Sequence, residues 1–333
     1  MDRGGQLIRR IARRLVRGRR LAPEPPRPAP RRKPYGTVPG PPLPPVENTL
    51  SPDDPWIHPP VAPTPGHVDL TDRVRPRSYD LELLEQLNEE YRDKPLVAAP
   101  REFSEEALAA DAQRRVRWAH NMVDLSNQTV LEVGCGGGYE TWSIAHNLGS
   151  DAYGVDITAQ ESWSQLEGER VHFAEADLTE KNIYEENTFD RIISYTVWEH
   201  VVHPHKLLEE TYKILKPGGL QWLRANLWAG PRASHRYRDI YFPWPHHLFS
   251  DDVINEWDRK NGREPEGSWW VNKLTWNHYE RYIHDVGFRL RKVQFQTCEW
   301  DEEFYQRFHD ILGRIPRTDL ERDFFLCVLE KPA

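Results

Sequence analysis

The chain has 333 residues, of which 38% are hydrophobic, enough for one large or two modest domains with a buried core. No run approaches the ~20 apolar residues of a membrane-spanning helix, and the three cysteines form no C-x-x-C pair, so neither a disulfide framework nor a zinc–thiolate site is expected. The net charge is −8, yet the first 34 residues carry +10 and the remainder −18, and an acidic body argues against a nucleic-acid substrate.

The N-terminal part of the chain predicts a tether. In residues 6–17, QLIRRIARRLVR, apolar and arginine side chains segregate to opposite sides of a helical wheel, which predicts a basic amphipathic helix within residues 1–22. Such a helix attaches reversibly to an anionic membrane face or to a partner, and a disordered basic tail is the alternative. Residues 23–77 form a predicted disordered linker, because 17 of the 28 prolines lie between positions 23 and 65. The cysteine content favours a cytoplasmic location, with peripheral contact at the inner membrane face through residues 6–17.

Two helices are predicted in residues 78–124, ahead of the first strand. Ser78 is positioned to cap a helix that continues to about Arg92, with leucines at helical spacing. A second helix is predicted from about Ser104 to Asp124.

The stretch VLEVGCGGGYET, residues 130–141, reads as a buried strand, a tight turn and the start of a helix. Glycine permits positive φ and leaves the main chain open to a ligand, while the first turn of a helix offers free N–H groups. A dinucleotide fingerprint, G-x-G-x-x-G, requires a glycine where Tyr139 stands, which disfavours a nicotinamide dehydrogenase. The pattern present is E-x-G-x-G-x-G, formed by Glu132, Gly134, Gly136 and Gly138.

Strand and helix signals alternate after this loop, which predicts a doubly wound α/β sheet. Strands are expected at residues 129–133, 152–156, 171–174, 190–195 and 220–225, and helices at 139–148, 160–166 and 205–215. A Lys-Pro-Gly-Gly turn at residues 216–219 precedes the fifth strand. Two more strands, 288–297 and 325–331, flank a helical region at 300–312.

The glycine loop and the acids that follow at strand ends resemble the class I S-adenosylmethionine (SAM)-dependent methyltransferases. The resemblance covers roughly residues 105–297 and implies SAM as the cofactor. It also implies a seven-stranded, doubly wound fold with an antiparallel strand added at the end and a helical N-terminal extension. The SAM-binding core would occupy residues 125–226, an aromatic-rich insertion 227–276, and the helix and strands that complete the sheet 277–333.

The resemblance assigns cofactor contacts at the ends of successive strands. Besides Glu132 and the three glycines of the loop, Asp156 would accept hydrogen bonds from both ribose hydroxyls, because a carboxylate offers two acceptor oxygens. Ile157 would pack on the adenine, Asp177 would accept from the adenine amino group, and the Leu178 amide would face the ring edge. Tyr195 and Thr196, with Ser194, would lie beside the methionine part of SAM.

His200 is the first candidate for a general base, because a histidine exchanges protons near neutral pH and it follows the fourth strand. His246 and His247 in the insertion compete for this role, and the sequence does not decide among the three. Glu199, His200, His203 and His205 are close enough in sequence to suggest a metal site. They lack a recognised ligand spacing, so no metal is predicted.

The insertion concentrates aromatic and basic residues, which suit a planar or sugar-like acceptor. They are Trp228, Arg232, His235, Arg236, Tyr237, Arg238, Tyr241, Trp244, His246, His247, Trp257, Trp269, Trp270 and Trp276. The leading hypothesis is methyl transfer to a small or glycan-like acceptor at a hydroxyl oxygen. The alternatives are a carbon or nitrogen methyltransferase of a quinone-like acceptor, and a SAM-binding interaction module without catalysis.

Overall fold

The computed structural model describes residues 78–97, 104–269 and 271–333. The predicted basic helix and proline-rich linker lie outside the described residues, so both stay predictions. No helix in the described part of the chain is long and apolar enough to cross a bilayer.

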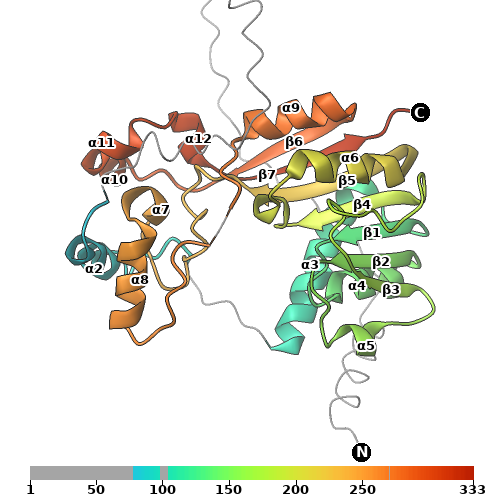
Figure 1. Ribbon diagram of the computed structural model, residues 1–333, viewed down its shortest axis with the longest axis horizontal. Coiled ribbons are helices and arrows are strands. Elements are labelled where there is room, and N and C mark those ends of the chain that lie inside the picture. Colours follow the sequence, from blue (N-terminus) through green and yellow to red (C-terminus); the bar gives the residue numbers. More distant parts are fainter. Residues whose placement is uncertain (1–77, 98–103, 270) are drawn as a thin grey trace, which may run out of the picture. The chain divides into compact units, whose positions relative to one another are not determined.

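A seven-stranded sheet organises the chain (Figure 1). Its strands run in the order β3-β2-β1-β4-β5-β7-β6; β1 to β5 pair in parallel, and β7 is antiparallel to both β5 and β6. The strands are β1 (Thr129–Val133), β2 (Asp151–Asp156), β3 (Val171–Glu175), β4 (Phe189–Tyr195), β5 (Leu215–Asn226), β6 (Arg289–Thr297) and β7 (Arg322–Glu330). This order and the antiparallel pairing confirm the predicted doubly wound fold.

The central strands β1 and β4 are largely buried because helices cover both faces of the sheet. Successive side chains of a strand point to opposite faces, so Val130 joins the cluster under α3 (Glu105–Val123) and α4 (Tyr139–Leu148). Its neighbour Leu131 joins the cluster on the other face, with α6 (Pro204–Ile214) and α9 (Trp276–Val286). Ile192 and Ile193 of β4 divide between the two clusters in the same way. Because β1 to β5 pair in parallel, their carboxyl ends lie at one edge of the sheet.

The N-terminal helices match the prediction except at one cap. The first, α2 (Leu81–Glu90), is capped by Asp80, whose carboxylate accepts from the Leu83 N–H at 3.0 Å. The prediction that Ser78 caps this helix is wrong. The Ser78 hydroxyl instead accepts from the N–H of Ser250 at 2.9 Å. Ser104 caps α3, near the predicted start of that helix.

The Lys-Pro-Gly-Gly segment is not a separate turn before β5 but part of that strand. Leu215 pairs with Phe189 and Leu220 with Arg191, so the residues between Leu215 and Leu220 bulge out of the ladder. Gly218 has a φ of +75°, which explains the glycine there. The helix predicted at 160–166 is also shorter, α5 (Trp163–Leu166).

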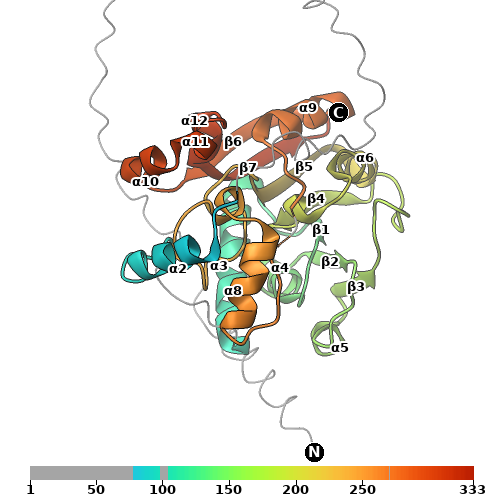
Figure 2. The same cartoon turned by 60° about the vertical axis from the view of Figure 1, so that its left-hand side comes forward.

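A third hydrophobic cluster lies away from the sheet (Figures 1 and 2). It joins α2 to two helices of the insertion, α7 (Pro245–Leu248) and α8 (Asp251–Lys260). It also includes side chains from the three helices between β6 and β7, which are α10 (Glu302–Arg307), α11 (His309–Leu312) and α12 (Arg317–Glu321). Trp244 and Trp257 are buried in this cluster, so part of the aromatic content of the insertion forms a core rather than a ligand surface.

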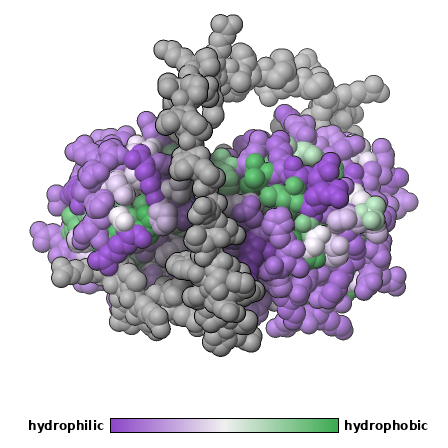
Figure 3. Space-filling model, turned by 90° about the horizontal axis from the view of Figure 1, so that it is seen from above, coloured by the Kyte–Doolittle hydropathy of each residue, from purple (hydrophilic) through white to green (hydrophobic). Residues whose placement is uncertain are grey.

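Most of the face drawn in Figure 3 is hydrophilic. Among the described residues only four large hydrophobic side chains are exposed, namely Ile157, Ile183, Val202 and Trp269. Singly exposed hydrophobic side chains are common on protein surfaces, so only their positions bear on a ligand site. Ile157 and Trp269 both lie next to the features described below.

Candidate cofactor and acceptor site

The glycine loop joins β1 to α4 through three residues of positive φ. Gly134, Gly136 and Gly138 have φ values of +75°, +47° and +77°. The N–H groups of Gly134 and Cys135 donate to the Val155 carbonyl at 2.7 and 3.1 Å, which holds the loop against the end of β2. Residues other than glycine rarely adopt a positive φ, so the glycine pattern in the sequence predicts the bend directly.

Two side chains of the α5 region brace the loop from outside. Trp163 donates its indole N–H to the Gly136 carbonyl at 2.7 Å, and the Ser162 hydroxyl donates to the Gly137 carbonyl at 2.9 Å. Both carbonyls are therefore occupied by the protein. The N–H groups of Gly134, Cys135, Gly136 and Gly138 also donate within the protein, so the loop offers a ligand mainly its open main-chain surface.

Glu132 lies beneath the loop. Its carboxylate accepts from the Thr141 hydroxyl at 2.6 Å and is buried, with 2% of the residue exposed. Burial, with the nearby carboxylate of Glu140, raises the pKa of Glu132 well above its usual range. Glu132 thus ties β1 to α4, and its contribution to a cofactor site is to position the loop.

Asp156 connects the end of β2 to the loop. One carboxylate oxygen accepts from the Gly136 N–H at 2.9 Å and the other from the Thr158 N–H at 3.2 Å. Each carboxylate oxygen can accept a second hydrogen bond, so Asp156 retains capacity for a vicinal diol. The next side chain, Ile157, is 70% exposed and is therefore accessible to an apolar ring of a ligand.

The end of β3 lies beside Asp156, because the Ala176 N–H donates to the Asp156 carbonyl at 2.9 Å. Asp177 is exposed, and one of its oxygens accepts from both the N–H and the hydroxyl of Thr179 at 2.7 Å. The Leu178 side chain is buried in the core, so only its main chain can face a ligand. The structure thus places Asp156 and Asp177, the two aspartates predicted to bind the adenosine of SAM, at the ends of adjacent strands.

At the end of β4 the hydroxyl of Tyr195 is already used. It donates to the Arg115 carbonyl of α3, the ring packs on Trp222, and burial raises the pKa of Tyr195 well above its usual range. Thr196 has a φ of +51°, and its N–H donates to the Arg224 carbonyl at 2.8 Å. A role for Tyr195 beside the methionine part of SAM would therefore depend on its main chain.

The loop has room for a ligand at one place. A Cβ on Gly134 would lie 2.2 Å from the Val197 side chain, and one on Gly138 would lie 2.5 Å from the Phe173 ring. A Cβ on Gly136 would meet no atom within 4 Å. The loop is closed at both ends and open in the middle, which fits a cofactor that rests on the main chain beside Asp156.

Gly136→Ala tests this cradle. We expect binding of the product S-adenosylhomocysteine to be lost, because the methyl group would occupy the open space, while the free energy of unfolding falls by only about 1–2 kcal/mol from the positive φ. Calorimetry and thermal unfolding measure the two effects. Gly134→Ala is the contrast, because its collision with Val197 should destabilise the fold itself. Unchanged cofactor affinity in Gly136→Ala would contradict the assignment.

A polar cluster begins two residues beyond Val197. Glu199 and His200, in the 3-10 turn η2 (Trp198–His200), and His235 of the insertion have donor atoms within 4.8 Å of one another. Glu199 is 1% exposed, neither of its carboxylate oxygens has a hydrogen-bond partner, and burial raises its pKa to about 7. Burial, with the nearby His200, lowers the pKa of His235 to about 3. The cluster therefore presents a neutral imidazole and a carboxyl that exchanges its proton near neutral pH.

His235 was not singled out as a candidate from the sequence, where it is one of many aromatic and basic residues. Its ring centroid lies 4.8 Å from that of His200 only because the insertion folds back onto η2. One carboxylate oxygen and two imidazole nitrogens form a donor set that could hold a divalent transition ion. His203 and His205, named with Glu199 in the sequence, are not in this group, and His205 lies 3.7 Å from Glu209 instead.

The other two base candidates lie apart from this group. His246 is hydrogen-bonded through Nε2 to the Trp228 carbonyl at 2.8 Å, and burial lowers its pKa to about 4. His247 is buried against it, with ring centroids 4.0 Å apart, and burial lowers the pKa of His247 too. The structure thus brings only His200 of the three candidates together with Glu199 and His235.

Comparison with known proteins identifies a domain in part of the chain. Residues 131–223 match a family model described as a methyltransferase domain. This part of the chain is a class I methyltransferase domain. SAM is the cofactor of this family, and the residues of the loop and strand ends fit it.

The relatives of the methyltransferase domain include enzymes with different acceptors. The chain is 33% identical over 138 residues to phosphoethanolamine N-methyltransferase 3 of Arabidopsis thaliana, covering 40% of this chain and 28% of that protein. It is 31% identical over 110 residues to the ubiquinone biosynthesis O-methyltransferase of Paraburkholderia phymatum, covering 32% and 47%. The chain spans less than half the length of both. A solved structure, Haemonchus contortus phosphoethanolamine N-methyltransferase 2 with SAM, has a TM-score of 0.45 and 17% identity, covering 80% of this chain and 60% of that one.

The matched methyltransferase domain contains the glycine loop, Asp156, Asp177, Glu199 and His200. It ends before Arg224, so His235 and the whole insertion lie outside it. The family match therefore covers Glu199 and His200 but not the insertion.

Proposed function

We propose that this chain transfers a methyl group from SAM to a hydroxyl oxygen of a small acceptor. The observation that carries the proposal is the adjacency of two features: an open main-chain cradle at Gly136 and a polar cluster around the buried Glu199. Val197, which contacts the cradle at Gly134, is two residues from that cluster. Val197 thus connects the proposed cofactor site with the proposed proton-accepting site.

Each group has a definite task in this proposal. SAM supplies a methyl group; its transfer to oxygen forms the O–C bond, leaves S-adenosylhomocysteine with the electron pair of the broken S–C bond, and releases the hydroxyl proton. Asp156, the loop and Asp177 hold the adenosine. Glu199, His200 and His235 orient the acceptor and take the proton, which needs heavy atoms within about 2.6–3.2 Å of the hydroxyl.

The cluster suits an acceptor that carries a hydrogen-bond donor and loses a proton on methylation. The buried carboxylate of Glu199 has no side-chain hydrogen-bond donor, so a donor on the ligand would stabilise it. A hydroxyl is such a donor. Methylation at nitrogen or carbon of a small acceptor is the alternative, and identification of the methylated product distinguishes them.

The direct test uses the purified full chain. Calorimetry should show binding of both SAM and S-adenosylhomocysteine, and release of S-adenosylhomocysteine should appear with catechols or methyl glycosides. Release with phosphoethanolamine alone would favour methylation at nitrogen. We expect the same turnover with and without EDTA, because Glu199 and His200 are sufficient to take the proton. Loss of turnover with EDTA, restored by Mn²⁺ or Zn²⁺, would instead give the cluster a metal-binding role. Cofactor binding with no turnover on any acceptor would favour a non-catalytic module.

A further inference from the structure

A pocket of about 240 Å³ opens in the insertion. Residues 235–239 line it together with Arg263, Glu266 and Trp269, so every lining residue lies beyond the matched methyltransferase domain. We call it the insertion pocket. His235 belongs both to this pocket and to the cluster with Glu199 and His200. A molecule in the insertion pocket would therefore lie next to the proton acceptors.

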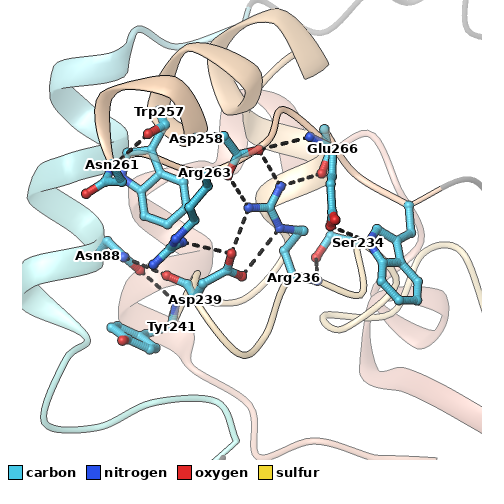
Figure 4. Close-up of polar contacts among 12 residues, drawn as sticks. Asn88, Ser234, Arg236, Asp239, Tyr241, Trp257, Asp258, Asn261, Arg263 and Glu266 are labelled. Carbon is cyan, nitrogen blue, oxygen red and sulfur yellow. Dashed lines mark hydrogen bonds and ion pairs between the residues drawn. The ribbon is translucent and has the colours of Figure 1, made fainter.

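Arg236 lines the insertion pocket and lies at the centre of a polar network, which Figure 4 shows. Its guanidinium is 4% exposed and donates to Asp258 at 3.0 Å, to Asp239 at 2.7 Å and to the Gly267 carbonyl at 2.6 Å. Arg263 donates to the same Asp239 at 2.9 Å. A buried, fully hydrogen-bonded guanidinium fixes the loop of residues 235–239 against α8, so the pocket is preformed.

The charges of the insertion pocket cancel. Its arginines are Arg236, Arg238 and Arg263, and the acids that line them or pair with them are Asp239, Asp258 and Glu266. Because the guanidinium of Arg236 is already paired with the carboxylates of Asp239 and Asp258, it is not available to bind a phosphate. A site for an anionic acceptor needs surplus positive charge, as phosphate sites have. The insertion pocket therefore favours a neutral ligand with several hydrogen-bonding groups.

Trp269 gives the insertion pocket an apolar face. It is 48% exposed, although tryptophan is ordinarily well buried, and two contacts orient it. Its ring stacks on His235 with centroids 5.9 Å apart and an interplanar angle of 16°, and its indole N–H donates to Glu266 at 3.2 Å. An exposed, oriented indole beside carboxylates and guanidinium groups suits a ring with an apolar C–H face and hydroxyls at its edge.

The volume limits the size of the ligand. Sites for drug-sized molecules are about 300–1,000 Å³, so a 240 Å³ pocket receives a single ring rather than a nucleotide or a quinone with a long tail. We propose that the insertion pocket binds one neutral, polyhydroxylated ring, a single sugar ring, and presents one of its hydroxyls to His200 and Glu199. The inference rests on the proposed function, because it names the acceptor class of that same site.

Saturation-transfer NMR and calorimetry on the full chain test the proposal, with the methyl glycosides of glucose, galactose, mannose and rhamnose as probes. We expect at least one glycoside to bind through its ring protons, with or without S-adenosylhomocysteine. Phosphoethanolamine should not compete with it. Trp269→Ala should weaken glycoside binding by about tenfold through loss of the stacking face, and Trp269→Phe should retain most of it.

Affinity for S-adenosylhomocysteine, measured on the same samples, should be unchanged in both variants, which shows that they fold. The proposal is overturned if no glycoside binds to the wild-type chain, if Trp269→Ala binds glycosides as tightly as wild type, or if phosphoethanolamine displaces them. Failure to bind S-adenosylhomocysteine, with glycoside binding intact, would contradict the proposed methyl transfer but not the sugar pocket.

Discussion

Asp156→Ala is expected to weaken binding of S-adenosylhomocysteine by about 100-fold or more, because charge-assisted hydrogen bonds contribute about 1.5–3 kcal/mol each. The carboxylate has two tasks that alanine cannot perform. It holds the Gly136 N–H at 2.9 Å, which shapes the open centre of the loop, and it offers its remaining lone pairs to the ribose. Isothermal calorimetry with S-adenosylhomocysteine measures the loss, and thermal unfolding shows how much of it comes from the loop.

Asp151→Ala is the matched control for this variant. Asp151 begins the strand that Asp156 ends, is exposed, and lies 3.9 Å from Arg170 in an exposed ion pair of little energetic weight. We expect wild-type cofactor affinity in Asp151→Ala. Equal affinity in Asp156→Ala and Asp151→Ala would remove the basis for the cofactor site.

His200→Ala is expected to lower kcat by about 10²–10⁴-fold while S-adenosylhomocysteine binds as in wild type, because general-base catalysis contributes a factor of that size. The residue lies on η2 beside the cofactor loop and contacts His235, and alanine at this position leaves no imidazole to take a proton. His203→Ala is the control. His203 is exposed, three residues further along, and outside the cluster, so its turnover should be unchanged.

The pH dependence of kcat/KM identifies the partner of His200. Burial raises the pKa of Glu199 to about 7, and only the deprotonated carboxylate accepts a proton, so kcat/KM should rise with pH through about 7. Glu199→Gln cannot titrate and should lose this part of the profile. An unaltered profile in Glu199→Gln, or full turnover in His200→Ala, would exclude the cluster from proton transfer.

The sequence alone determined the fold class and predicted the residues that we propose for the cofactor half of the site. Gly134, Gly136 and Gly138 favour positive φ, so local backbone preference sets the bend of the loop. Asp156 ends β2, which pairs in parallel with β1, so the order of the strands places Asp156 beside the loop. Helix starts were less well determined. Asp80 rather than Ser78 caps α2, because tertiary packing gives Ser78 a partner in Ser250.

Only the tertiary structure brought together the residues that we propose for binding the acceptor. Glu199 and His200 are neighbours in the chain, but His235 reaches them from an insertion whose path no local periodicity encodes. Burial separated the aromatic residues in the same way: Trp244 and Trp257 form a core, whereas Trp269 keeps an exposed face. The physical reason is that sequence patterns report the preferences of adjacent residues, whereas burial and the encounter of distant side chains depend on how the whole chain packs.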